Sequence, residues 1–439
     1  MPPWRRMRSG CGCRTARMPA IPDGLVPGMR SRKPPLRFRG DGTFTIVQFS
    51  DTEFCRDDDE ERRMAAMMER ILKDEDADLA VFTGDVIASL GHPDPVEAFR
   101  RACRVPEQAG VRWAAVFGNH DSEGMVTREQ LHALQLAYPL NAAKPDPPGI
   151  HGSGNYVLTV MGSGAGTAGA DGDSGVDGDS GADWAARAAE AVGGYEDAGA
   201  DGNAACAGRK SGQLAGRKFI GNEPGQRLNG PRGRAVCVAG FDSNSPAAAL
   251  YFLDSGSYSP LEYTRMGFYD WIRRDQIDWY VSQSQGLTED NGGVPLPSLA
   301  FFHIPLPEYN DVWDFTVCYG ERNADFSCAP WINSGMFAAM IEMGDVVGTF
   351  AGHDHGHDYW GEWHGIRLSF GRTTRNGYLD RPFLPGARVI RMREGSREFE
   401  SWIHLEDGTV IREQQRHEPT GRTPQIGAMG LDKIYPGAF

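Results

Sequence analysis

The sequence has no apolar run of the kind that crosses a membrane, which needs about 18 or more residues with few or no charges. The N-terminal arginines Arg5, Arg6 and Arg8 are not followed by the apolar stretch of a secretory signal peptide. We therefore expect a soluble chain without a signal peptide and favour a cytoplasmic location. An organelle transit peptide is the alternative to a disordered basic tail, because this leader is rich in arginine and poor in acids.

Cysteine is scarce, with eight residues among 439. Cys11 and Cys13 lack the further nearby ligands that a zinc site requires. Cys318 and Cys328 could form a disulfide in an oxidising compartment, but we predict that both are free thiols. Cys237 is predicted to lie in a core strand. We find no internal repeat.

The net charge is spread unevenly along the chain. The formal net charge is −14, yet residues 1–40 hold ten Lys/Arg and one acidic residue, a net of +9 that leaves −23 for the rest. Such an acidic body repels the backbones of nucleic acids, so we expect no nucleic-acid partner. Acidic clusters can instead supply ligands for cations.

The N-terminal half alternates between apolar strands and amphipathic helices. Strand and helix patterns follow one another in the order β, α, β, α, β, which predicts a mostly parallel sheet with helical crossovers. Later segments add strands, so we expect an α/β fold with two mixed sheets flanked by helices. The predicted strands include 44–50, 79–83, 113–117, 235–239, 249–253, 298–302, 345–350, 366–370, 387–391 and 399–404, and the predicted helices are 57–78, one from Asp94, 275–284 and 335–343.

Gly, Ala, Asp and Ser dominate the middle of the chain, where this pattern fails. We interpret residues 161–233 as a flexible low-complexity insertion with one short helix at 184–191. The expected organisation is a disordered basic tail over 1–42, a core domain over 43–405 that contains the insertion, and a C-terminal extension over 406–439.

Five short stretches each place a side chain that can bind metal directly after an apolar strand. Ligand sites of open α/β sheets lie beyond the carboxyl ends of the strands, so these stretches are expected to converge. Each alone predicts little: a lone Gly-Asp is usually a turn, and a lone His303 is usually a core histidine. Together, their carboxylate, amide and imidazole groups suit Mn, Fe, Zn or Mg. The stretches are Ser50–Glu53, Gly84–Asp85, Gly118–Asp121, Phe302–Pro305 and Gly352–His355.

In these motifs the sequence resembles the calcineurin-like metallophosphoesterase superfamily. The likeness covers roughly residues 43–405 apart from the insertion. Within the superfamily it looks most like the probable inactive purple acid phosphatase 29-like proteins and related fungal phosphatases. The stretches that carry this narrower likeness are Gly154–Tyr156, Leu250–Gly256, Phe301–Pro307 and Asn333–Gly335. The iron-binding tyrosine of true purple acid phosphatases is missing after Asp85, so we do not expect their chemistry.

The resemblance implies an αββα sandwich with a dinuclear centre. One ion would be held by Asp51, Asp85 and His355, and the other by Asp85, Asn119, His303 and His353. Asp85 would bridge the pair, since a shared carboxylate offsets the repulsion between two close cations. A water activated by the ions would attack the phosphate.

His120 is the expected general acid or phosphate-binding group, and Asp121 is expected to fix its tautomer. The alternative is that Asp121 only closes the turn. We expect Asp354 to orient its loop, and His357 and His364 to be solvated surface residues. Two arginines, Arg372 and Arg375, could reach a substrate phosphate, although a plain surface role is equally compatible with their positions.

Glu53 departs from the pattern of the superfamily, which has histidine at this place. A carboxylate can still bind metal, but it should shift the preference from zinc towards Mn, Fe or Mg. We predict an active phosphatase with altered metal preference. The alternatives are a phosphodiesterase built on the same core, and a catalytically silent metal-binding scaffold because Glu53 replaces the usual histidine. Glu53 could also point away, which would leave the first metal weakly bound.

Overall fold

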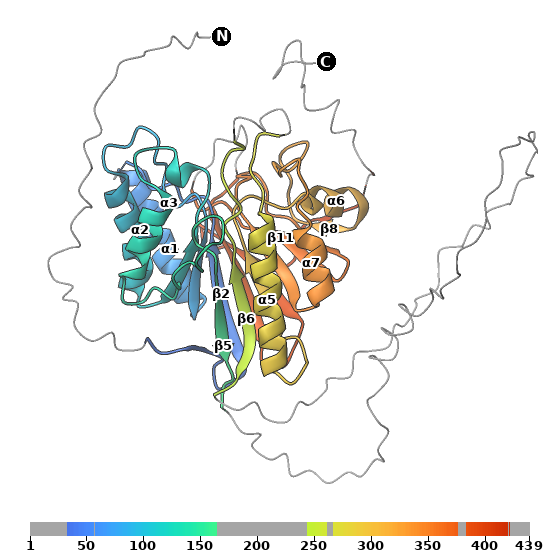
Figure 1. Ribbon diagram of the computed structural model, residues 1–439. Coiled ribbons are helices and arrows are strands. Elements are labelled where there is room, and N and C mark those ends of the chain that lie inside the picture. Colours follow the sequence, from blue (N-terminus) through green and yellow to red (C-terminus); the bar gives the residue numbers. More distant parts are fainter. Residues whose placement is uncertain are drawn as a thin grey trace, which may run out of the picture. The chain divides into compact units, whose positions relative to one another are not determined.

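The computed structural model describes residues 33–56, 58–164, 244–260, 267–375, 383–419 and 421. Within these residues, two β-sheets pack face to face and helices cover the outer face of each sheet (Figure 1). This is the predicted α/β fold with two mixed sheets. The helix predicted at 184–191 and the strand predicted at 235–239 lie outside the described residues.

The first sheet contains the strands that end at three of the five motifs. Its order is β14-β13-β12-β2-β3-β4, and the neighbours β2, β3 and β4 are parallel while the other pairs are antiparallel. The strands are β2 Thr43–Phe49, β3 Leu79–Thr83, β4 Arg112–Val116, β12 Gly386–Arg393, β13 Phe399–Leu405 and β14 Val410–Ile411.

The second sheet has the order β1-β5-β6-β7-β9-β11-β10-β8-β15. Its central strands β6, β7, β9 and β11 are parallel, so their carboxyl ends meet at one edge. The strands are β1 Leu36–Arg37, β5 Tyr156–Met161, β6 Pro246–Phe252, β7 Ser298–Phe301, β8 Cys318–Tyr319, β9 Val346–Ala351, β10 Trp360–Trp363, β11 Ile366–Phe370 and β15 Arg416–His417.

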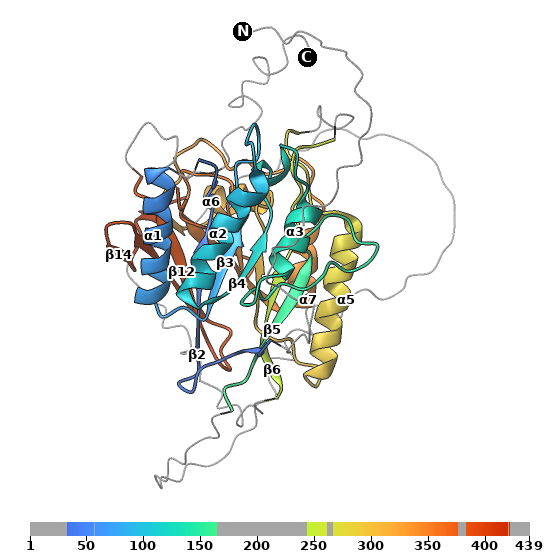
Figure 2. The ribbon, with the colours of Figure 1, turned by 90° about the vertical axis from the view of Figure 1, so that its left-hand side faces the viewer.

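Helices α1, α2 and α3 pack on the first sheet, whereas α5, α6 and α7 pack on the second (Figure 2). Their starts follow simple capping rules: the Asp58 side chain accepts a hydrogen bond from the amide of Glu61, and Asp94 does the same for Glu97. The bounds are α1 Asp59–Asp74, α2 Pro95–Ala109, α3 Arg128–Leu136, α5 Arg274–Asp290, α6 Glu308–Phe315 and α7 Met336–Met343.

Strand β2 shows how the sequence produces the layers. Its side chains alternate between faces, so Phe44 and Ile46 pack between the sheets while Val47 and Phe49 pack under α1 and α2. Because both faces of β2 are covered, the strand is apolar almost throughout, as parallel strands of this class are. The buried strand pins the residues that follow it, Ser50 to Glu53, at the edge of the sheet.

Short strands lie outside both ends of the predicted core domain. The packed unit begins before residue 43, because Leu36 and Arg37 form β1 beside β5 and Phe38 is buried. It also continues past residue 405, because β14 pairs with β13 and β15 pairs with β8. Short edge strands with mixed polar residues carry little periodicity, so the sequence pattern missed them.

Two further expectations concern residues that the structure describes. Cys55, Cys103, Cys318 and Cys328 are free thiols, as predicted for the last two. No helix among the described residues is both long and apolar enough to cross a membrane.

Candidate metal centre

The five motifs meet where the two sheets touch at their carboxyl edges. Asp51 and Glu53 follow β2, Asp85 follows β3, and Asn119 follows β4. His303 follows β7 and His353 follows β9 in the second sheet. Gln48 of β2 donates to the carbonyl of Ala351 at the end of β9 (3.1 Å), which ties the two edges together. Parallel strands from both sheets thus deliver polar side chains to one place.

Backbone strain marks the same place. Six residues other than glycine have positive φ within the described ranges, and four of them are candidate ligands. The φ angles are +55° at Asp51, +44° at Glu53, +46° at Asp85 and +79° at His353. Residues other than glycine rarely adopt a positive φ, because the conformation costs about 1–3 kcal/mol per residue. Such outliers cluster at functional sites.

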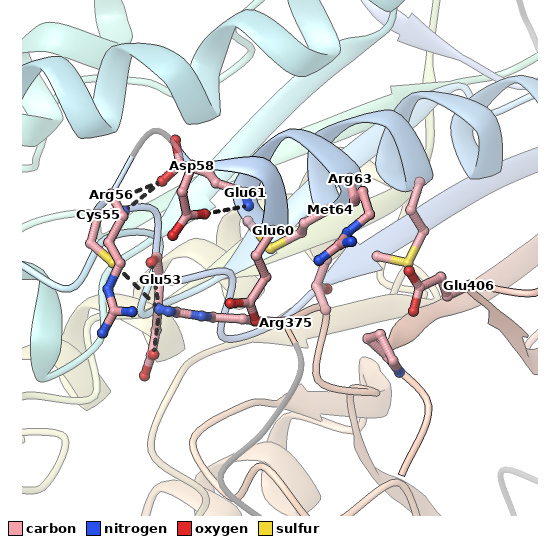
Figure 3. Close-up of a pocket in the computed structure, with 13 residues that line it drawn as sticks. Glu53, Cys55, Arg56, Asp58, Glu60, Glu61, Arg63, Met64, Arg375 and Glu406 are labelled. Atoms are coloured by element: carbon pink, nitrogen blue, oxygen red, sulfur yellow. Dashed lines mark hydrogen bonds and ion pairs between the residues drawn. The ribbon is translucent and has the colours of Figure 1, made fainter. Parts of the chain in front are cut away.

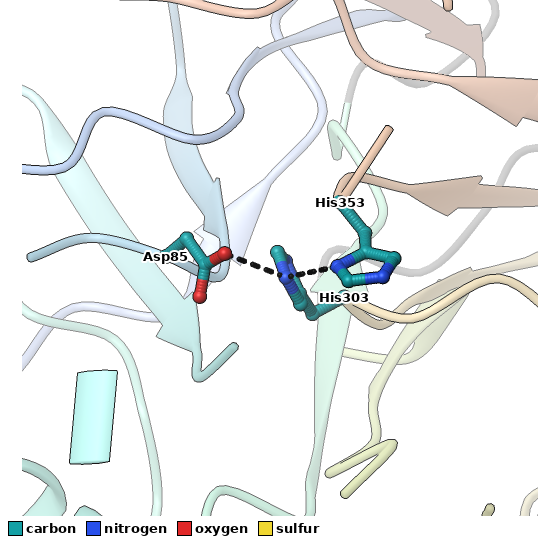
Figure 4. A group of neighbouring side chains, drawn as sticks. All are labelled: Asp85, His303 and His353. Carbon is teal, nitrogen blue, oxygen red and sulfur yellow. Dashed lines mark hydrogen bonds and ion pairs between the residues drawn. The ribbon is translucent and has the colours of Figure 1, made fainter. Parts of the chain in front are cut away.

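His303 stands at the centre of one group of candidate ligands (Figure 4). Its Nδ1 lies 2.9 Å from the carbonyl of Thr83, a contact made by Nδ1–H, so Nε2 is the nitrogen that can take a second proton or bind a metal ion. Nε2 lies 3.0 Å from Oδ2 of Asp85, 3.3 Å from Oδ1 of Asn119 and 3.2 Å from Nδ1 of His353. The oxygens of Asp85 and Asn119 are both acceptors, so the arrangement is favourable when a proton or a metal ion lies at Nε2 of His303.

The residues fit a divalent cation on two further observations. Nε2 of His353 is buried and has no hydrogen-bond partner among the described residues. Ligand atoms of Asp85, His303 and His353 all lie within 4.8 Å of one another, a spacing compatible with one ion. An orphaned imidazole beside a buried carboxylate is the donor set that Mn, Fe and Zn accept.

The electrostatics of the cluster also call for a cation. Burial alone would lower the pKa of His303, but the Asp85 carboxylate beside it raises the pKa to about 9. Burial likewise opposes protonation of His355, whose pKa is raised to about 9 by its contact with Asp51. The buried carboxylates thus draw positive charge, which two metal ions would supply in place of protons.

A second group lies beside the first. Nε2 of His355 is 3.5 Å from Oδ1 of Asp51 and 3.5 Å from Oε1 of Glu53. The Asp51 carboxylate also accepts from the amide of His353 at 3.0 Å. Glu53 and Asp85 share a 4.8 Å neighbourhood with His120 rather than with His355. Asp85 therefore lies next to both groups, where a bridging carboxylate would be placed.

Glu53 contacts His355 and also has a cationic partner, Arg375 (Figure 3). Nη1 of Arg375 donates to Oε2 of Glu53 at 3.2 Å and to its carbonyl at 3.0 Å. Burial raises the pKa of Glu53. The pair lines a pocket together with Arg56, Asp58 and Arg63. Arg375 offsets the negative charge that Glu53 brings to the place where the superfamily has a histidine.

His120 is held by a different acid than expected. Its Nδ1 lies 2.8 Å from Glu123, while Asp121 accepts from the backbone amides of Gly118 (2.7 Å) and Ile87 (2.9 Å). Glu123, and not the predicted Asp121, is therefore the acid that can fix the tautomer of His120. Asp121 closes the turn, which was the alternative interpretation. Burial, followed by the Asp85 charge, raises the pKa of Asp121 to about 7.

Glu123 and Tyr258 complete a chain of hydrogen bonds that sequence reasoning missed. The Tyr258 hydroxyl donates to Glu123 at 2.5 Å and accepts from the Asn119 side chain at 3.0 Å. Glu123 lies three residues after His120, in a turn of 3-10 helix (His120–Ser122), so its helical spacing was the available signal. Nothing in the sequence near Tyr258 pointed to this contact.

Four weaker expectations have mixed outcomes. Arg372 is buried and pairs with Asp358 at 2.7 Å, so it neither reaches a phosphate nor lies on the surface. His357 is 2% exposed, not solvated, because it packs against Phe370 and Tyr359. His364 is exposed as predicted, and Asp354 orients its loop by accepting from the amide of Cys328 at 3.0 Å.

Two glycines are required by close approach at the centre. A Cβ at Gly84, whose φ is +87°, would lie 2.5 Å from Cγ of His303. At Gly118 it would lie 2.1 Å from Oδ1 of Asp85. Real Cβ atoms do not approach so closely, so any side chain at either position would displace a candidate ligand.

Comparison with known proteins agrees with this geometry. A family model described as calcineurin-like phosphoesterase matches residues 44–167. A protein of Arabidopsis thaliana named probable inactive purple acid phosphatase 14 is 26% identical over 84% of this chain and 79% of its own length. Probable inactive purple acid phosphatase 29 of the same plant is 28% identical over 79% of this chain and 75% of its own length. Phosphatase DCR2 of Saccharomyces cerevisiae is 25% identical over 73% of this chain and 45% of its own length.

Proposed function

We propose that this chain, which belongs to the calcineurin-like phosphoesterase superfamily, hydrolyses phosphate monoesters with a dinuclear metal centre. One observation carries the proposal above the others. Nε2 of His303 faces a carboxylate oxygen, an amide oxygen and a second imidazole nitrogen at 3.0–3.3 Å, a donor set that a bound divalent cation would stabilise. We assign Asp85, Asn119, His303 and His353 to one ion, and Asp51, Glu53, Asp85 and His355 to the other.

When bound, the ions would activate a water and neutralise charge on the phosphate oxygens. The chain's own residues then have separate tasks. Asp85, through the amide of His120 (2.8 Å from Oδ1), holds the loop that carries the acid. His120 gives its proton to the leaving oxygen as the bond between that oxygen and phosphorus breaks. Glu123 fixes the orientation of the His120 ring.

His120 is suited to this task by position and charge. Its side chain is 36% exposed, so a substrate can reach it, while Nε2 lies 3.9 Å from Asp85. Burial alone would lower the pKa of His120, but Asp85 and Glu123 raise it above its ordinary value. The imidazole therefore remains protonated further into the neutral range, where a general acid is needed.

The direct test uses metal-stripped protein supplied with Mn, Fe, Zn or Mg in turn. We expect restored hydrolysis of a chromogenic monoester, with a smaller rate for the matching diester. Two of the relatives compared above carry the word inactive in their names and another is named a phosphatase, so turnover decides between enzyme and scaffold. A faster diester rate would indicate a phosphodiesterase. Bound metal without turnover of either ester would refute the proposal and leave a metal-binding scaffold.

Glu53→His is expected to raise zinc-supported turnover relative to manganese-supported turnover by about tenfold, because an imidazole nitrogen replaces a harder carboxylate oxygen. The measurement is the ratio of kcat/KM with the two metals. Arg375→Met is the matched control: it also breaks the ion pair but keeps Glu53, so the ratio should stay near the wild-type value. If wild type were inactive with every metal and Glu53→His were active, Glu53 would be the residue that silences the site.

A further inference from the structure

Three aromatic side chains, Tyr258, Phe268 and Tyr269, pack together beside the candidate metal centre, and we call them the aromatic wall. The ring of Phe268 lies 5.2 Å from that of Tyr258 and 5.1 Å from that of Tyr269, both edge to face. The two tyrosine rings are stacked at 5.9 Å. The bridge between Tyr258 and Tyr269 and the 2.9 Å bond from the Ser259 amide to the Phe268 carbonyl fix the backbone under these rings.

The wall touches the centre at two points. The Tyr258 hydroxyl accepts from the Asn119 side chain, and the Tyr269 ring lies edge to face 4.3 Å from His353. Phe268, the third member, is 58% exposed. Trp331, which is 44% exposed, lies against Gly267 next to it. The wall therefore runs from the candidate ligands outwards into solvent.

The wall borders the candidate general acid as well as the candidate ligands. Glu123 joins Tyr258 to Nδ1 of His120, the residue that protonates the leaving oxygen in the proposed function. A leaving group that extends outwards from the candidate ligands would therefore have the wall, which contacts Asn119 and His353, as a neighbour. Leu90 and Met125 are two more exposed apolar residues. They directly follow Ser89 and Gly124 in the chain, and the amide of Gly124 donates to the hydroxyl of Ser89 at 3.0 Å. The amide of Ser89 in turn donates to the carbonyl of His120.

A contiguous exposed apolar surface next to a candidate site is a marker of ligand binding. A flat apolar group laid against Phe268 would bury part of that surface and gain an edge-to-face or stacked contact. A small polar alcohol, such as the serine of a phosphoserine, would leave the wall in water. The arrangement therefore discriminates by the leaving group and not by the phosphate.

We propose that the aromatic wall is a leaving-group subsite and that the chain prefers aryl phosphate esters with extended flat leaving groups. This inference rests on the proposed function. We assign Phe268 as the specificity-determining residue. It is the exposed member of the wall, and its ring contacts both tyrosines.

The test compares 2-naphthyl phosphate with phenyl phosphate, whose leaving groups have similar acidity but different apolar area. The wild-type protein is expected to favour the naphthyl ester by about five- to tenfold in kcat/KM, in line with the strength of one aromatic contact. Phe268→Ala should bring this ratio close to one and Phe268→Tyr should preserve it. Phe315→Ala is the matched control, because Phe315 is an exposed phenylalanine on α6 that packs against Trp363. It should leave the ratio unchanged.

A binding measurement separates failure of this inference from failure of the proposed function. Dissociation constants of the non-hydrolysable naphthyl- and phenylphosphonates are measured by calorimetry on the metal-loaded protein. Tighter naphthyl binding that Phe268→Ala abolishes supports the subsite even if neither ester is turned over. Equal binding and equal turnover of the two compounds would overturn the subsite while leaving the phosphatase in place.

Discussion

Asp85→Asn is expected to lower the metal-dependent kcat/KM for phosphate monoesters by about a thousandfold or more. Asp85 is buried next to both groups of candidate ligands, and in the proposed function its charge would offset the repulsion between two cations. Asparagine keeps an oxygen for the amide of His120 but loses that charge. The measurement is steady-state hydrolysis by wild type and variant at saturating metal, together with metal content per chain.

The folded state of the variant needs its own check. The metal-free Asp85→Asn protein should unfold at a lower temperature than metal-free wild type, because it loses the attraction to His303 that outweighs burial and lowers the pKa of Asp85. Asp345→Asn is the matched control, since Asp345 is equally buried but accepts from Tyr251 and Tyr280. It should keep metal binding. Full activity of Asp85→Asn would contradict the bridging role.

His120→Asn is expected to lower kcat for phenyl phosphate by about 10²–10⁴-fold, the usual contribution of a general acid. The loss should be much smaller for 4-nitrophenyl phosphate, whose leaving oxygen departs without needing a proton. Bound metal should stay at the wild-type level, because His120 is not assigned as a ligand. The measurement is the dependence of kcat on leaving-group acidity, which should steepen in the variant.

Glu123→Gln tests the same step through its positioning residue. The change removes a carboxylate that raises the pKa of His120, so that pKa should fall. A general acid works only when protonated, so the alkaline limb of the pH–rate profile for phenyl phosphate should move to lower pH. Glu129→Gln, a change at an exposed glutamate on α3, should leave the profile unchanged.

An equal loss for good and poor leaving groups in His120→Asn would instead assign His120 to phosphate binding.

The fold was predictable where burial on both faces of a strand produced long apolar runs. Segments such as β2 and β3, and the amphipathic α1, have periodicities that follow directly from packing between two covered layers. The short edge strands β1, β14 and β15 have two residues each. Their pairing depends on tertiary neighbours and not on a local pattern, so no periodicity in the sequence predicted these strands.

The candidate site divides in the same way. Residues placed by a strand end, such as Asp85 and His303, could be inferred because a parallel sheet sends its carboxyl ends to one edge. Contacts between loops could not. Glu123 replaces Asp121 as the partner of His120, and Arg375 turns towards Glu53, because these side chains depend on turn geometry that the sequence pattern leaves open.

The most direct test of the central claim is a metal titration of stripped wild-type protein in which bound ions per chain and monoester turnover are followed together. We predict two ions per chain, with turnover that appears mainly as the second ion binds. Saturation at one ion, or turnover that persists without any metal, would contradict a dinuclear phosphatase centre built from Asp85 and its neighbours.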